Sequence, residues 1–202
     1  MNNTVSPVGL SFKGNLITKV KGRHNVMEQV SKRFAERTKS IPGTLEIVRG
    51  GQDYPGAMIF QLKDNPMIFS VCDYGNLFAQ NSKKTTKKQV NDITSRFINI
   101  FKVLKAEAQH ADTIRSAETN LSRVERDMIA NKRFLTALRE EGNDKFIKIF
   151  ENLVKSNEKN INKLNSIIDM ATNKYLTTLD KIAQKDKSIE MFAACEREYF
   201  TK

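Results

Sequence analysis

Hydrophobic and polar positions follow two different patterns, which meet near residue 82. Before that point, short apolar runs alternate with turn residues; after it, apolar residues recur every three or four positions. All four prolines and eight of the nine glycines lie at or before Gly75. Because Pro and Gly interrupt helices and shape turns, the pattern predicts a small mixed domain over residues 9–82 and a long helical region over residues 83–202.

The first region predicts one helix among short strands. Weak alternation over residues 16–20 indicates a strand, and Asn25 is a suitable N-cap for a helix that Pro42 would end. The hydrophobic core of so small a domain is only marginally stable by itself. We therefore expect contacts with the long helices to stabilise it. Three further runs are rich in Ile, Val and Phe and are separated by turn residues, which is typical of an antiparallel meander in a β-α-β-β-β order; they cover residues 45–48, 57–62 and 67–72.

The second region has the pattern of a coiled coil. Thr86 and Gln89 fit a capping box, which would start a helix at this point. From Val90 to Leu138 the apolar residues are spaced alternately by three and four, with gaps at Glu107 and Glu118. This spacing predicts a narrow coiled-coil seam rather than the wider apolar stripe of a globular helix.

The helical region is interrupted by one cluster of helix-breaking residues, at 140–144. Gly142 can take the left-handed conformation that closes a helix, and Asn143 or Asp144 can cap the next one. We therefore expect the tip of a helical hairpin at residues 141–143.

Two arms of similar length would leave this tip, over about 87–140 and about 144–200. The matched lengths favour an antiparallel hairpin. A break near Asp186 is conceivable, because its side chain could cap a separate helix, but the stripe stays in phase and continuity is favoured. The return stripe is Phe146, Phe150, Leu153, Ile161, Leu164, Ile168, Ala171, Tyr175, Leu179, Ile182, Ile189, Phe192, Cys195 and Tyr199.

The seam is uneven along its length. Near the small domain, Phe97, Phe101 and their neighbours cover most of the helix circumference, which implies burial by the small domain or by a second chain. At the tip, Phe134, Phe146 and Phe150 are expected to meet. Other apolar residues lie off the main seam and favour dimerisation into a four-helix arrangement; they are Ile98, Ile129, Ile147, Val154 and Ile167.

Positive charge is concentrated at one end of the hairpin. The chain has a formal net charge of +11, yet residues 106–179 hold 12 Lys and Arg against 11 Asp and Glu. The densest run of lysines begins the first long helix. It is either a solvated face or a binding site for nucleic acid, an acidic protein or anionic lipid headgroups; its members are Lys83, Lys84, Lys87 and Lys88.

Length and composition exclude several classes of protein. The chain has 202 residues, of which 39% are hydrophobic, so wholesale disorder is not expected. Its apolar runs are far shorter than the roughly 20 residues of a membrane span. Residues 1–8 are polar and contain no cleavable secretory signal, so they are either a disordered leader or an uncleaved export signal, and we expect a cytoplasmic location. Cys72 and Cys195 allow at most one disulfide.

Residues that could carry catalysis are few. No His/Cys group has metal-ligand spacing, and no phosphate-binding loop or nucleophile elbow occurs. One short stretch resembles the core of metal-dependent nucleases of the PD-(D/E)xK type: Asp53, followed by Gln61 and Lys63 on a strand. The resemblance implies acids that hold Mg²⁺ and a lysine that assists the attacking water. Here Gln61 occupies the position of the second acid, so the pair of acids is incomplete. Asp53 lies in a Tyr-Pro-Gly turn, and this turn is enough to explain an Asp at that position without a catalytic role.

These features predict an α+β, predominantly α protein that is not an enzyme and needs no cofactor or metal. We expect its hairpin to bind or space a protein partner, and a homodimer is one form of that function. Binding of a polyanion such as nucleic acid through the basic end is the alternative, and nuclease activity is a remote one.

Overall fold

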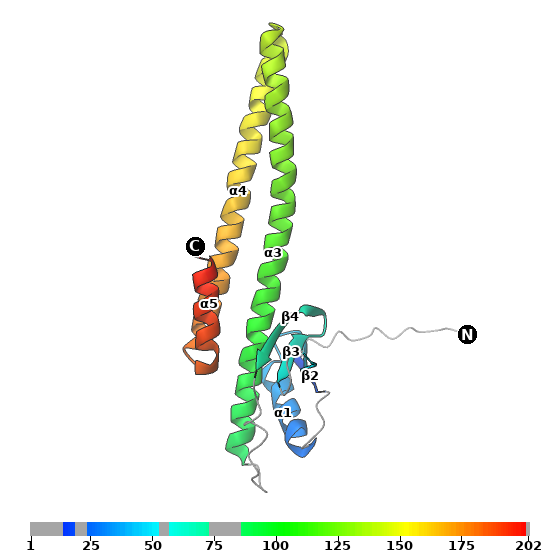
Figure 1. The fold of residues 1–202 in the computed structure, drawn as a ribbon, viewed down its shortest axis with the longest axis vertical. Coiled ribbons are helices and arrows are strands. Elements are labelled where there is room, and N and C mark those ends of the chain that lie inside the picture. Colours follow the sequence, from blue (N-terminus) through cyan, green and yellow to red (C-terminus); the bar gives the residue numbers. More distant parts are fainter. Residues whose placement is uncertain (1–13, 19–23, 53–56, 73–85, 201–202) are drawn as a thin grey trace, which may run out of the picture. The chain divides into compact units, whose positions relative to one another are not determined.

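The computed structural model describes residues 14–18, 24–52, 57–72 and 86–200. The fold is α+β and mainly helical, as predicted, with a four-stranded sheet and one helix ahead of a long helical hairpin (Figure 1). The chain forms two compact units, Met1–Lys105 and Ala106–Lys202, which divide inside the first long helix. The expected boundary near residue 82 and the expected leader lie outside the described residues.

The first unit contains β1 (Gly14–Thr18), α1 (His24–Arg37), β2 (Gly43–Arg49), β3 (Met58–Leu62) and β4 (Asn65–Cys72). The sheet has the order β1-β2-β3-β4. β1 and β2 are parallel, and α1 forms the crossover that such a pair requires. β2, β3 and β4 are antiparallel, which confirms the predicted meander.

Helix α1 differs from its predicted bounds at both ends. It starts at His24, so Asn25 lies inside the helix, and it ends at Arg37 rather than near Pro42. Thr38 explains the earlier end. Its carbonyl oxygen accepts hydrogen bonds from the backbone N–H groups of Gly14 in β1 and of Ile41, both outside the helix. These bonds turn the chain toward the sheet.

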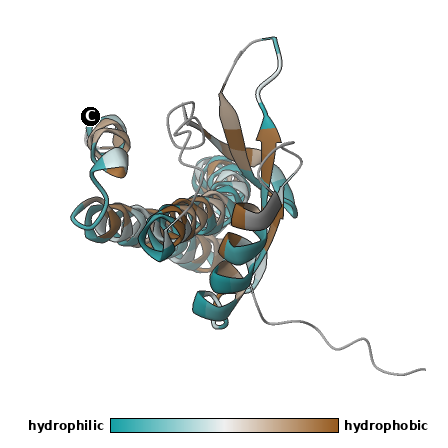
Figure 2. Ribbon diagram, turned by 90° about the horizontal axis from the view of Figure 1, so that it is seen from below, coloured by the Kyte–Doolittle hydropathy of each residue, from teal (hydrophilic) through white to brown (hydrophobic). Residues whose placement is uncertain are grey.

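The core of the first unit is completed by the first turns of α3 (Lys87–Glu140). Phe97 meets Phe60 of β3 edge-on, with 5.2 Å between ring centroids, and Phe101 lies 5.4 Å from Phe34 of α1. All four rings are fully buried. The same chain therefore covers these two phenylalanines of α3, which was one of the two alternatives left by the sequence. Figure 2 shows brown, hydrophobic stretches in the strands of this unit.

Both ends of α3 follow the sequence. The N–H of Gln89 donates to Thr86 Oγ1 at 3.2 Å, and Gln89 Oε1 accepts from the N–H of Thr86 at 2.9 Å, so the capping box is confirmed. At the tip, Gly142 has a φ of 67°, the left-handed conformation expected there. Asn143 stands at the N-cap position of α4 (Asp144–Ala183), but its side chain makes no capping hydrogen bond. None of the helices within the described ranges has an apolar stretch long enough to cross a membrane.

Near the tip, α4 uses a seam one residue later than predicted. Ile147 and Val154 are half-buried, whereas Phe146 and Leu153 are 43% and 42% exposed. The prediction that placed the first pair off the seam and the second pair on it is wrong. Both pairs are apolar, so hydrophobic spacing could not decide between them. The observed rotation lets glutamates of α4 pair with basic residues of α3, as described below.

The prediction of one continuous return arm is wrong. α3 has 54 residues, but α4 has 40 and ends at Ala183. A short 3₁₀ helix, η1 (Lys187–Ile189), and a separate helix α5 (Glu190–Phe200) follow, and α5 lies back along α4 (Figure 1). Asp186 causes the break: its carboxylate accepts from the N–H of Ser188 at 3.1 Å and from its hydroxyl at 2.6 Å.

The three- and four-residue spacing of apolar positions continues across this break because α5 also has one apolar face. Ile189 and Ala193 are buried, but Cys195, predicted on the seam, is an exposed free thiol. The side chain of Cys72 lies outside the described residues. Periodicity alone therefore could not distinguish a continuing helix from one that turns back.

Candidate functional site

Two of the four lysines predicted to bind anions can be located. Lys87 and Lys88 are exposed in the first turn of α3, whereas Lys83 and Lys84 lie outside the described residues. The capping box already occupies the N–H of Gln89. This end of α3 also offers an anion the positive charge of its exposed lysines.

Basic residues of α1, which the sequence did not single out, lie beside this turn. Arg33 Nη1 donates to the carbonyl oxygen of Lys87 at 3.3 Å and also contacts Asn91 Oδ1. Arg37 Nη1 donates to Ser95 Oγ at 3.0 Å. Two arginines of α1 thus extend the basic surface of α3. The sequence could not reveal this, because it does not show which face of α1 adjoins α3.

The two described residues of the nuclease-like stretch, Gln61 and Lys63, do not form the arrangement that the resemblance implies. Gln61 Nε2 donates to Glu46 Oε2 of β2 at 2.7 Å, so its amide is engaged by a neighbouring strand. Lys63 is exposed in the turn after β3 and is not part of that strand, contrary to the prediction. Asp53 lies outside the described residues. Across the described ranges, no three His, Cys, Asp or Glu side chains come together as metal ligands.

The second unit contains an aromatic cluster that joins α3, α4 and α5. His110 stacks on Tyr175 with 4.8 Å between ring centroids and an interplanar angle of 10°. Phe200 of α5 meets the His110 ring edge-on at 5.1 Å. The imidazole Nε2 is 3.1 Å from Thr172 Oγ1, which fixes the ring from the other helix. The cluster holds the last turn of α5 against the hairpin.

Two carboxyl groups lie beside this aromatic cluster. Tyr175 Oη donates to Glu196 Oε2 of α5 at 3.0 Å. Burial, and then the charge of Glu196, raises the pKa of Glu107 from 4.5 to about 7. Burial likewise raises the pKa of Tyr175 above 10.0, while it lowers the pKa of His110 below 6.5 against the opposing charge of Glu196. A proton on Glu107 therefore removes a repulsion within the cluster.

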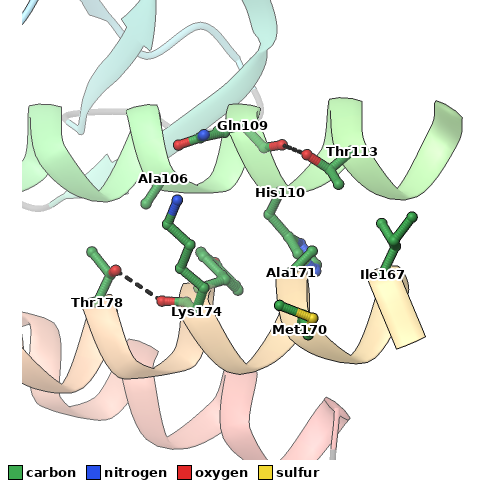
Figure 3. Close-up of a pocket in the computed structure, with 10 residues that line it drawn as sticks. Ala106, Gln109, His110, Thr113, Ile167, Met170, Ala171, Lys174 and Thr178 are labelled. Atoms are coloured by element: carbon green, nitrogen blue, oxygen red, sulfur yellow. Dashed lines mark hydrogen bonds between the residues drawn. The ribbon is translucent and has the colours of Figure 1, made fainter. Parts of the chain in front are cut away.

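A pocket of about 260 Å³ lies next to the aromatic cluster, between α3 and α4 (Figure 3). Its lining is mainly apolar. Figure 3 shows Lys174 extending from α4 toward α3 beside Ala106, and His110 extending from α3 toward Ala171. The residues that line the pocket are Ala106, Gln109, His110, Thr113, Ile167, Met170, Ala171, Lys174, Tyr175 and Thr178.

The hairpin near its tip has two different sides. One side, here called the charged flank, holds the ion pairs Arg139–Glu151 at 2.9 Å and Lys132–Glu158 at 3.5 Å. The other side, called the apolar flank, consists of large side chains that are 42–59% exposed: Phe134, Phe146, Ile149 and Leu153.

These two flanks lie on opposite sides of the seam. In a heptad repeat, the residue that directly follows one seam position projects to one side of the seam. The residue that directly precedes the next seam position projects to the other side. Glu151 follows the seam residue Phe150, and Leu153 precedes the seam residue Val154. Phe134 joins the apolar flank through Phe150, at 5.7 Å between ring centroids, which confirms one of the contacts predicted for the tip.

No family model, curated protein or solved structure matches this chain. The candidate sites therefore rest on residues alone. The sequence contained one overlooked signal of the aromatic cluster: of the two acids that interrupt the apolar seam, Glu107 and Glu118, the first lies one helical turn before His110. An acid at a seam position is a candidate for a buried carboxyl group.

Proposed function

We propose that this protein is a non-enzymatic interaction protein whose hairpin dimerises, with the apolar flank of one copy packed against that of a second copy. The observation that carries this proposal is the exposure of Phe134, Phe146, Ile149 and Leu153 along one side of the tip. Their spacing on α4, three and four residues apart, is that of a second seam. A second seam on a helix that already packs in a hairpin is typical of four-helix arrangements.

The charges of the arms favour a second copy as the partner. Residues 106–179 hold almost equal numbers of basic and acidic side chains, 12 and 11. A nearly neutral flank carries no charge that would select an acidic or a basic partner. In a contact with two-fold symmetry the same patch meets itself, so an apolar flank is complementary to its own copy.

Substitution of the flank tests the dimer. The double variant Phe134→Lys/Leu153→Lys should weaken dimerisation at least about a hundredfold, because it would bury two unpaired charges per copy in the interface. Multi-angle light scattering at high micromolar concentration should give twice the chain mass for the unaltered protein and one chain mass for the variant.

Ile129→Lys is the matched control. Ile129 is 50% exposed and lies three residues before Lys132, so it shares the side of the charged flank. Its substitution should leave the dimer intact. A strict monomer in the unaltered protein, or a dimer that survives Phe134→Lys/Leu153→Lys, would refute the proposal.

Polyanion binding through the basic end is the second candidate function. It is favoured by the exposed Lys87 and Lys88 beside Arg33 of α1. Lysines that bind phosphates release counterions, so the affinity should fall steeply as the salt concentration rises.

Lys87→Glu/Lys88→Glu should abolish retention on heparin at low salt and lower the slope of log affinity against log salt by about two. Lys159→Glu/Lys163→Glu, which makes the same change in net charge on exposed positions of α4, should elute nearly as the unaltered protein does. Equal elution of both variants would show that retention depends on net charge and not on this end of the chain.

A further inference from the structure

The hollow between α3 and α4 follows from small residues in its walls. Ala106 of α3 and Ala171 of α4 line the pocket where larger side chains fill other parts of a hairpin. Ile167 and Met170 border the opening and remain 36% and 69% exposed. Apolar surface that its own chain leaves open can gain free energy by burial against an apolar group of a ligand.

Among the residues that line the pocket, Lys174 supplies the charge that favours an anion. Lys174 is exposed, and its ammonium group has no ion-pair partner among the described residues. The hydroxyls of Thr113 and Thr178 donate to backbone carbonyl oxygens of their own helices, both at 2.8 Å. His110 is held by Thr172 and by its stack on the neighbouring tyrosine, so it forms a wall of the pocket.

We propose that this pocket binds a small amphipathic carboxylate, with the apolar part in the hollow and the carboxylate paired with Lys174. The volume of about 260 Å³ is below the roughly 300–1,000 Å³ of sites for drug-sized ligands, so the apolar part is a short acyl chain or a single ring. This site is separate from the apolar flank at the tip and does not depend on dimerisation.

Titration calorimetry with octanoate on the full chain tests the site. Octanoate should bind with a dissociation constant below about 1 mM, and 1-octanol should bind about tenfold more weakly, because it lacks the charge-assisted hydrogen bond. The ε-methyl resonance of Met170, which lines the pocket, should shift on binding and so report the location.

Three variants separate this site from non-specific uptake of an apolar molecule. Lys174→Met should weaken octanoate binding about tenfold and leave the affinity for 1-octanol unchanged. Lys163→Met, at an exposed position of α4 outside the pocket, should change neither affinity. Ala171→Leu should fill the hollow and weaken both ligands, provided that circular dichroism shows an unchanged fold.

The proposal fails if octanoate produces no heat and no shift of the Met170 methyl resonance. It also fails if Lys174→Met and Lys163→Met affect octanoate equally, since binding would then reflect the overall charge of the chain. Because Lys174 is exposed, its substitution is not expected to disturb folding, so this comparison stands even if Ala171→Leu misfolds.

Discussion

Phe101→Ala is expected to destabilise the first unit by about 3–5 kcal/mol. Phe101 is fully buried and its ring lies 5.4 Å from that of Phe34. The substitution removes buried apolar surface, leaves a cavity and breaks the aromatic pair between α3 and α1. Urea denaturation followed by circular dichroism should show the transition of this unit at a much lower midpoint.

Met67→Ala is the control for this loss of stability. Met67 belongs to the same unit and is 84% exposed, so its substitution should change the free energy of unfolding by no more than about 0.5 kcal/mol. Phe34→Ala combined with Phe101→Ala should cost less than the sum of the two single changes, because each removes the same contact. A loss below about 1 kcal/mol for Phe101→Ala would contradict the core described above.

Glu107→Gln is expected to stabilise the second unit at pH 8. The pKa of Glu107 is raised from 4.5 to about 7 in the folded chain, so between these values the folded chain keeps a proton that the unfolded chain has lost. The free energy of unfolding therefore falls as the pH rises through this window. Since the group is partly exposed and solvent screens its charge, we expect a gain of about 1–2 kcal/mol from the substitution.

His110 has the opposite dependence on pH. Its pKa lies below 6.5 in the folded chain, so its contribution to stability is lost as the pH falls below 6.5. His110 contributes in both proteins, so the difference between the unaltered protein and the Glu107→Gln variant isolates Glu107, and the variant should show no decline between pH 6.5 and pH 8. Glu118→Gln makes the same charge change at an exposed position of the same helix. In this variant the free energy of unfolding should still fall as the pH rises.

The sequence predicted those features that local patterns determine. The start of α3 at Lys87 follows from the capping box of Thr86 and Gln89, and the tip follows from Gly142. The meander was readable because turn residues separate its strands. Each of these depends on neighbours in the chain, which is why a single sequence was sufficient.

Features that depend on partners distant in sequence were not predicted. Ile147 and Phe146 are equally apolar, and only pairing with α3 decides which faces the seam. Asp186 has the residue type of a cap, but whether α5 turns back depends on contacts such as that of Tyr175 with Glu196. Glu107 marked a position beside the aromatic cluster, but its proton affinity depends on burial and on the charge of Glu196, which is distant in sequence.

The completion of the first core by α3 determines the order in which the two units can fold. Phe34 packs on Phe101 and Phe60 packs on Phe97, and long segments of chain separate the two members of each pair. Formation of this core therefore pays the entropic cost of closing a long loop. The contacts around the tip join residues close in sequence and form quickly. In a refolding experiment the hairpin near Gly142 should gain hydrogen-exchange protection first, and the sheet should follow as the slower kinetic phase.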